Sequence, residues 1–347
     1  MTTKSWWHGP VKAEPDFENI LKVLRRERPA RPTLFEFFFN STLHRSLTAG
    51  IDTTQMVDSQ IVVHAFRNAG YDYAMIWSSD FWFEAGTADK KSTQSLNDGA
   101  VITGRASFET YPWPNPAQAN FSNLEQAAGV LLPGMKIISP GPGGVLENVI
   151  RLVGYDSLCY LLADDPELTK EIFDAVGSRL VRYYQILLQH DAVGAIIGND
   201  DWGYKTQPML SPDDMREYVV PWHRKIAAAA HSAGKPAIMH SCGNLKTLMD
   251  DIIDDIGYDA KHSYEDLILP VEESYEQYGR RIAILGGLDL DFVIRSEPEA
   301  VYRRAKAMLE RSADRGGYAL GTGNSVPEYV PEEHYFAMIS AVTEGRY

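Results

Sequence analysis

The segment Lys235-Pro-Ala-Ile-Met-His-Ser-Cys-Gly-Asn244 places an apolar run directly before a histidine, a cysteine and a glycine. A short apolar run that ends in polar residues and glycine is typical of a buried strand that turns into a helix. Side chains alternate along a strand, so His240 and Cys242 project to the same side of the sheet. Imidazole and thiolate are both ligands that zinc prefers. The segment therefore predicts a strand that ends in half of a metal site.

The same alternation of apolar run and helical pattern recurs along the whole chain. We expect eight strands, at residues 33–39, 73–78, 135–139, 193–198, 235–240, 258–263, 281–286 and 317–320. Helical patterns lie near residues 15–27, 57–69, 165–190, 211–233, 244–256, 267–278, 297–314 and 331–343. Eight strands that alternate with helices predict an α/β fold, a (β/α)8 barrel in a single domain.

The expected domain plan is a short extension, a barrel and one insertion. Residues 1–30 form an N-terminal extension with a helix, and the barrel takes residues 31–347. Residues 85–130, polar and then rich in Pro and Asn, are predicted to form a lid inserted after strand two. An open doubly wound sheet would need Gly-x-Gly-x-x-Gly after the first strand, which is absent. Gly141-Pro-Gly-Gly144 is interpreted as a turn and not as a phosphate cradle.

Composition limits the classes of protein to consider. The 347 residues carry a formal net charge of −14 and are 44% hydrophobic, enough for an ample core. A strongly acidic chain does not favour nucleic acid or an anionic membrane as partner. Cys159 and Cys242 are too few for a disulfide framework, and neither a leader nor a membrane-spanning run is evident. We expect a soluble, cytoplasmic enzyme that acts on a small molecule.

Polar residues gather where the predicted strands end. In a barrel the carboxyl ends of all strands meet at one mouth, where active sites lie. We expect Asp80, Asp200 and Tyr204 to serve as catalytic acid–base residues. The residues expected to bind substrate at the same mouth are Glu36, Asn40, Trp82, Asp201, Trp202, Thr322 and Asn324.

Three segments carry a resemblance to a known family. They are Met239-His-Ser-Cys-Gly-Asn244, Leu285-Gly-Gly-Leu-Asp289, and Leu320-Gly-Thr-Gly-Asn-Ser-Val-Pro327 followed by Pro331-Glu332. Over residues 30–345 the chain resembles the uroporphyrinogen decarboxylase superfamily, which also contains zinc-dependent, cobamide-linked methyltransferases. The resemblance implies a barrel fold in its own right.

The chain departs from the decarboxylase itself at two motifs. Glu36-Phe-Phe-Phe-Asn40 stands where the decarboxylase pattern has Arg-Gln-Ala-Gly-Arg, whose arginines hold propionate groups. A carboxylate cannot replace guanidinium donors toward a multiply anionic porphyrinogen. Thr322 replaces the histidine of a Leu-Gly-His-Gly sequence, and only the Ser79-Asp80 context is kept. We therefore do not expect decarboxylation of uroporphyrinogen.

The methyltransferase branch matches better. Its zinc ligands are a His-x-Cys pair after strand five, which the resemblance assigns to His240 and Cys242, and a cysteine whose position is taken here by Thr322. Threonine is a weak zinc ligand. The resemblance implies a carboxylate after strand six in its place, so we expect Glu265 to complete the set and leave a fourth position open. The resemblance also implies a corrinoid carried by a separate protein, because no Asp-x-His-x-x-Gly cobalamin signature occurs in the chain.

The aromatic residues expected near the mouth indicate the direction of methyl transfer. They are Phe37, Phe38, Phe39, Trp77, Phe81, Trp82, Trp113 and Trp202, and they favour a methoxylated aromatic donor, that is, an O-demethylase type. A methylcobamide:thiol or methylcobamide:tetrahydrofolate methyltransferase is the first alternative. The others are a metal-free, decarboxylase-like lyase that uses Asp80, Asp200 and Tyr204, and a binding module without catalysis.

Overall fold

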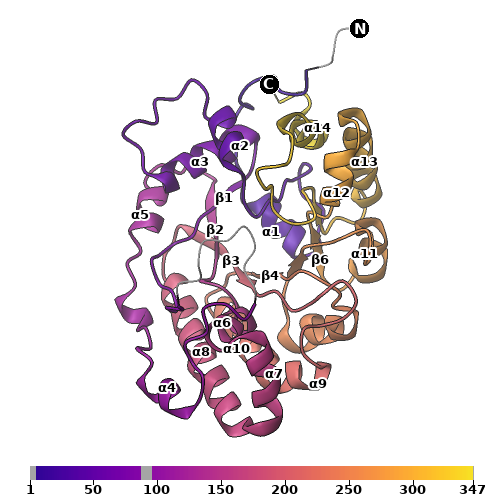
Figure 1. Cartoon of the computed structure of the whole chain (residues 1–347). Coiled ribbons are helices and arrows are strands. Elements are labelled where there is room, and N and C mark those ends of the chain that lie inside the picture. Colours follow the sequence, from indigo (N-terminus) through magenta and orange to yellow (C-terminus); the bar gives the residue numbers. More distant parts are fainter. Residues whose placement is uncertain (1–4, 87–95, 347) are drawn as a thin grey trace.

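Seven parallel strands form the central sheet, and each strand pairs with the next along the chain. The computed structural model describes residues 5–86 and 96–346. Figure 1 shows the sheet curling through the middle of the molecule, with helices around it. The strands are β1 (Tyr73–Met75), β2 (Lys136–Pro140), β3 (Val193–Asn199), β4 (Ala237–His240), β5 (Ala260–His262), β6 (Ala283–Leu285) and β7 (Tyr318–Ala319).

The first of the eight expected strands is not a regular strand, and that prediction is wrong. Within the predicted strand 33–39, only Leu34 forms a β-bridge, parallel to Leu320, next to β7. This bridge brings the two ends of the curled sheet toward closure. On the side facing β1, the Glu36 amide donates to the Tyr73 hydroxyl at 2.7 Å, so a side chain takes the place of a backbone partner. The result is a seven-stranded, barrel-like α/β fold.

Helices cover the outer face of the sheet (Figure 1). The longer ones pack against neighbouring helices and strands, as α8 does against α10 and α13 against α14. The α-helices are α1 (Glu18–Leu24), α2 (Ser41–Leu47), α3 (Asp58–Ala69), α4 (Arg105–Thr110), α5 (Ser122–Ala128), α6 (Val145–Val153), α7 (Tyr155–Asp164), α8 (Pro166–Leu187), α9 (Pro212–Asp214), α10 (Val220–Ser232), α11 (Val271–Tyr278), α12 (Leu290–Arg295), α13 (Pro298–Ser312) and α14 (Glu332–Thr343). Short 3₁₀ turns are η1 (Pro116–Gln118) and η3 (Lys246–Leu248), and π turns are η2 (Met215–Val219) and η4 (Asp251–Ile256).

Within residues 5–86 and 96–346, no helix has the length and apolar character that crossing a bilayer requires.

Helix α6 is an element that the sequence pattern did not predict. It follows the Gly141-Pro-Gly-Gly144 turn, and the Glu147 side chain accepts the Gly144 amide at 3.0 Å in the manner of a capping box. The spacing Gly144-x-x-Glu147 before an apolar run was therefore a readable start signal. The predicted helix 244–256 is instead the pair of short turns η3 and η4.

The insertion lies on the outside of the barrel in its described part. Of the predicted lid 85–130, residues 87–95 lie outside the described residues. The rest contains α4, η1 and α5; α5 packs against α3, and η1 packs against α8. This anchoring fixes the entry and exit of the insertion beside β1 and β2.

Strand register decides which side chains face the barrel interior. Asn199 lies beside His240, and His240 lies beside His262, in the parallel ladders of β3, β4 and β5. Residues that neighbour one another in register share a face of the sheet, whereas adjacent residues in one strand point to opposite faces. His240 and His262 therefore face one side, and Lys261 faces the other.

Candidate metal centre

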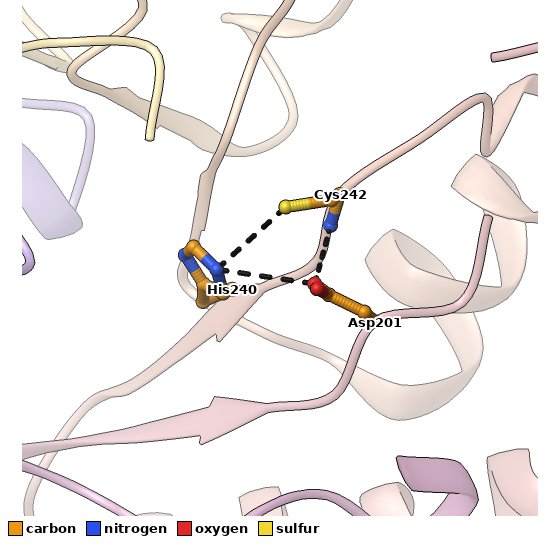
Figure 2. A group of neighbouring side chains, drawn as sticks. All are labelled: Asp201, His240 and Cys242. Atoms are coloured by element: carbon orange, nitrogen blue, oxygen red, sulfur yellow. Dashed lines mark hydrogen bonds and ion pairs between the residues drawn. The ribbon is translucent and has the colours of Figure 1, made fainter. Parts of the chain in front are cut away.

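Three side chains converge where β3 and β4 end. The His240 Nε2 atom lies 3.9 Å from the Cys242 Sγ and 3.9 Å from the Asp201 Oδ1. The Cys242 amide donates to the same Asp201 oxygen at 2.9 Å, which holds the carboxylate against the turn after β4. Figure 2 shows the three side chains directed at one another. One ligand atom from each residue lies within 4.8 Å of the others, so a single ion can touch all three.

The donor set fits zinc. Zinc bonds of about 2.3 Å to sulfur and about 2.0 Å to nitrogen or oxygen place tetrahedral ligands roughly 3.3–3.6 Å apart. The two separations of 3.9 Å from His240 Nε2 exceed this range by a few tenths of an ångström. Imidazole, thiolate and carboxylate are also the three ligand types that zinc favours, and three protein ligands leave a fourth position for water or substrate.

Without a bound ion, the side chains of His240 and Cys242 are both uncharged. Burial lowers the pKa of His240 to about 4, and burial raises the pKa of the Cys242 thiol to about 12. Because a zinc ligand must be a neutral imidazole or a thiolate, His240 is ready to bind while Cys242 must lose a proton. Metal binding at this cluster therefore releases a proton from Cys242.

Further polar groups surround the cluster. His240 and His262 share a hydrogen bond between their Nδ1 atoms at 2.8 Å. The Asn324 amide donates to the Cys242 Sγ at 3.2 Å, and the Ser263 hydroxyl donates to the same atom at 3.4 Å. Asn324, predicted to bind substrate, also lines a cavity of about 770 Å³ at the mouth. The cluster thus borders a space large enough for a small molecule.

Asp200 lies on the opposite face from its neighbour Asp201. Its fully buried carboxylate accepts the Leu146 and Glu147 amides, both at 2.9 Å, at the start of α6. It also bonds the His223 Nε2 at 2.9 Å, and the His223 Nδ1 bonds the Tyr258 hydroxyl at 2.7 Å. The α6 N-terminus is therefore filled by a carboxylate from the protein itself, which agrees with the interpretation of Gly141–Gly144 as a turn.

Glu36 and Thr322 form a second buried pair. The Thr322 hydroxyl donates to the Glu36 Oε1 at 2.7 Å, and the Thr322 amide donates to the Oε2 at 3.2 Å. Both residues have no exposed surface, and burial raises the pKa of Glu36 to about 8. The position at which the family pattern has a third cysteine is thus occupied by a threonine already bonded to a carboxyl group.

The other predicted site residues lie at several places around the mouth. Asp80 is exposed and accepts the Asn120 amide of the insertion at 2.8 Å. Asn40 is buried, where it caps α2 and donates to the Pro327 carbonyl. Tyr204 and Trp82 are about two-fifths exposed, and Trp202 is fully buried against His223.

Glu265, the predicted third ligand, is outside the group of three converging ligand atoms. It lines the 770 Å³ cavity with Asn324 instead. Strand β5 ends at His262, and Ser263 has a φ of 85°, so the chain turns before Glu265 can share the face of His240. Asp201, which the sequence suggested as a substrate ligand, is the carboxylate that lies in place.

Two neighbours of the cluster were not predicted from the sequence. Lys261 is only 4% exposed, and burial lowers its pKa to about 8. Ser263 bonds the candidate thiolate from a left-handed backbone conformation, which a non-glycine residue rarely adopts. The position of Lys261 inside the predicted strand 258–263 was the signal in the sequence for this feature.

Comparison with known proteins gives relatives of two activities. The chain is 25% identical over 182 residues to a methylated-thiol–coenzyme M methyltransferase from Methanosarcina mazei, a match that covers 51% of this chain and 46% of that protein. It is 24% identical over 187 residues to a uroporphyrinogen decarboxylase from Methylococcus capsulatus, covering 53% of this chain and 51% of that protein. The chain spans about half the length of these curated relatives.

A solved structure and a family model extend the match. A methyltransferase from Methanosarcina mazei superimposes with a TM-score of 0.69 at 16% identity, over 95% of this chain and 99% of that one, which shows a shared fold. The family model described as Uroporphyrinogen decarboxylase (URO-D) matches residues 141–345, from the Gly141 turn through the segments around His240 and Thr322 to α14. Because that match covers more than half of the sequence, the chain belongs to the uroporphyrinogen decarboxylase family.

Proposed function

We propose that the protein is a zinc-dependent methyltransferase that moves a methyl group between a small molecule and the cobalt of a separate corrinoid protein. The observation that carries this proposal is the convergence of Asp201, His240 and Cys242 at the mouth. Zinc held there would act as a Lewis acid on the substrate oxygen or sulfur that carries or receives the methyl group. Glu36 argues against the decarboxylase activity, because it stands where the resemblance has an arginine that holds a propionate.

The protein residues around the cluster have separate tasks in this proposal. Asp201, His240 and Cys242 would hold the ion, and the half-buried Asn324 would orient the substrate at the cavity while it bonds the Cys242 sulfur. Glu265 lines the same cavity and would contact the substrate rather than the ion. The corrinoid partner would dock at this mouth, with its cobalt facing the substrate.

Aromatic side chains beside His240 favour a methoxylated aromatic donor. Phe37 stacks on the His240 ring with centroids 4.3 Å apart, and Phe37 contacts both Phe38 and Trp77. Phe38 and Trp77 are 39% and 40% exposed, unusually open for such large apolar groups. Trp82 is also open, and the Arg151 guanidinium lies over its ring. An aromatic donor would cover this surface, so we place the enzyme on the donor side, as an O-demethylase type.

A thiol acceptor is the second candidate, favoured by the charged residues in the lining of the cavity. The 770 Å³ space is lined by Lys205, Glu265, Asp289 and Asn324 among others, which suits a small charged molecule better than a methoxylated ring. The curated relative from Methanosarcina mazei is named for a methylated thiol and coenzyme M. The metal-free lyase has less support, because the carboxylate of Asp200 is fully buried and used by α6 and His223.

One experiment separates these possibilities. Metal analysis of the purified protein should find one zinc per chain, and Cys242→Ala should remove it while the matched control Cys159→Ala keeps it. The loaded protein is then mixed with cob(I)alamin and guaiacol, or with methylcob(III)alamin and a small thiol, and the cobalt absorbance is followed. Methylation of cobalt by guaiacol supports the donor side, and demethylation by the thiol supports the second candidate. Protein without zinc in its unmutated form would refute the metal mechanism.

A further inference from the structure

Three consecutive residues at the end of β5, Lys261, His262 and Ser263, contact the candidate ligands or their backbone. His262 bonds His240, Ser263 bonds Cys242, and Lys261 bonds the carbonyls on both sides of the turn. The three residues are buried, at 4%, 0% and 5% exposure. None of them converges with the three ligand atoms, so their contribution lies in how they hold the ligands.

The first step concerns the proton between the two histidines. Two ring nitrogens 2.8 Å apart share one proton, so one Nδ1 donates and the other accepts. A histidine that binds metal through Nε2 carries its proton on Nδ1 and must donate it. His262 must then accept through Nδ1 and keep its own proton on Nε2. When His240 donates, this bond fixes the tautomer in which the His240 Nε2 lone pair faces Cys242 and Asp201.

The surroundings of His262 favour this arrangement. A Cβ placed on Gly286 would lie 2.3 Å from the Thr322 carbonyl oxygen and 3.1 Å from His262 Nε2, so the oxygen and the ring nitrogen flank the same glycine. A carbonyl oxygen can only accept a hydrogen bond, so the Thr322 oxygen is compatible with a proton on Nε2. The Nε2 atom itself is buried without a hydrogen-bond partner in the described part of the chain, which leaves the His240 bond as the one that fixes this ring.

The second step concerns the sulfur. Ser263 reaches the Cys242 Sγ with its hydroxyl from a backbone φ of 85°. A non-glycine residue rarely adopts this conformation, and it persists only where surrounding contacts hold it. Donors aimed at a sulfur stabilise the thiolate form that a metal requires.

Lys261 supplies the contacts that hold this turn. Its Nζ lies 2.6 Å from the Ser263 carbonyl oxygen and 3.3 Å from the Ser241 carbonyl oxygen, so one amine ties the turn after β5 to the turn that carries Cys242. A third contact of 3.4 Å goes to the His262 carbonyl. These bonds hold the Ser263 carbonyl on Lys261 while the Ser263 hydroxyl bonds the sulfur.

We propose that Lys261, His262 and Ser263 are positioning residues that prepare His240 and Cys242 for metal binding, His262 by fixing the imidazole tautomer and Lys261 by holding the Ser263 hydroxyl on the sulfur. The proposal rests on the metal site of the proposed function. It predicts that metal affinity and the ligand-to-metal spectrum depend on residues that never touch the ion.

The test of His262 uses Co²⁺ as the probe. His262→Leu removes the acceptor, whereas His262→Asn keeps an acceptor near the Nδ1 position and is the matched control. Loss of such a supporting partner typically weakens metal binding about tenfold to a hundredfold. We expect that loss in His262→Leu and recovery to within about threefold in His262→Asn. Equal affinity in the leucine variant and the unmutated protein would overturn the role of His262.

The test of Ser263 and Lys261 uses the thiolate-to-cobalt charge-transfer band. Removing a donor from the sulfur shifts this band to lower energy, so Ser263→Ala and Ser263→Gly should show the same red shift. Agreement between them separates the hydroxyl from backbone strain, because glycine adopts the left-handed conformation freely. Lys261→Met should shift the band in the same direction. The double variant that combines Lys261→Met with Ser263→Ala should show a shift smaller than the sum of the shifts of the two single variants. An unchanged band in both serine variants, or additive shifts in the double variant, would overturn this part.

A measurement without metal keeps the two proposals distinguishable. Nuclear magnetic resonance of isotope-labelled histidine ring nitrogens in the metal-free protein should show His240 with its proton on Nδ1, and His262→Leu should abolish that preference. Unmutated protein that binds neither Zn²⁺ nor Co²⁺ but shows this tautomer refutes the metal site and retains the tautomer selection. A proton on the His240 Nε2 in the unmutated protein refutes the tautomer selection whatever the metal result.

Discussion

The two faces of the sheet at the ends of β3 and β4 each hold an aspartate and a histidine, yet the two groups are built differently. On the outer face, Asp200, His223 and Tyr258 bond one another and the start of α6 at 2.7–2.9 Å. On the inner face, the His240 Nε2 stands 3.9 Å from both of its polar neighbours, Asp201 and Cys242. Polar groups that satisfy each other stabilise a fold, whereas groups that converge and remain too far apart to bond well leave capacity for a ligand.

The largest expected effect tests the inner face. Cys242→Ala should weaken zinc binding on the order of 1,000-fold, because it removes the thiolate from a three-ligand site. The thermal unfolding of the metal-free protein should change little, since the Cys242 side chain is small and only half-buried. Competition with a chromophoric chelator measures the affinity, and Cys159→Ala is the control. Unchanged zinc affinity in Cys242→Ala would show that Cys242 is not a ligand, and the inner face would then no longer differ from the outer face as a metal site.

The next effect tests the outer face. Asp200→Ala should lower the free energy of unfolding by about 3–5 kcal/mol, because two amides and His223 lose a buried acceptor together. Denaturant unfolding of the metal-free protein measures this. If Asp200→Ala is as stable as the unmutated chain but inactive, the outer group is catalytic and the original prediction for Asp200 gains support.

The neighbouring aspartate provides the paired comparison. Asp201→Asn should leave the free energy of unfolding within about 1 kcal/mol, because the side chain is 43% exposed and an amide oxygen can still accept from Cys242. Zinc affinity should fall about tenfold to a hundredfold, since an amide is a poorer ligand than a carboxylate. Calorimetric titration of zinc into both aspartate variants gives the two values. A fall in stability without a fall in affinity would assign Asp201 to the fold.

The smallest effect concerns the buried Glu36, which is bonded by Thr322 and the Phe37 amide. Burial raises the pKa of Glu36 to about 8 from an ordinary value of 4.5. Between these two pH values the folded chain holds a proton that the unfolded chain has released, so stability falls as pH rises through that window. The difference in free energy of unfolding between Glu36→Gln and the unmutated protein should change by about 1.4 kcal/mol for each pH unit inside this window. A constant difference across the window would contradict the burial of a neutral carboxyl.

Features that depend on the local alternation of side chains along a strand could be predicted from the sequence. His240 and Cys242 share a face because each is two residues from the other at a strand end, and the seven regular strands coincide with seven of the predicted runs. Local alternation could not show which of Asp200 and Asp201 lies near His240, because that depends on the direction in which the chain turns after β3. Glu265 lies outside the group of converging ligand atoms, and the chain turns at Ser263 before it reaches Glu265. The predicted strand 33–39 failed because Glu36 bonds Thr322 and Tyr73 instead of continuing a ladder.

The Leu34–Leu320 bridge has a consequence for the order in which the molecule assembles. His240 and His262 are separated by 22 positions, so their contact requires closing only a short loop. The contact between Glu36 and Thr322 spans 286 positions and waits for nearly the entire chain. On a ribosome, the neighbourhood of His240 can therefore form while the last strand is still unsynthesised. Closure of the barrel is then the late step, and a chain truncated before Leu320 should retain early structure around β3 to β5 but leave Glu36 and its apolar neighbours uncovered.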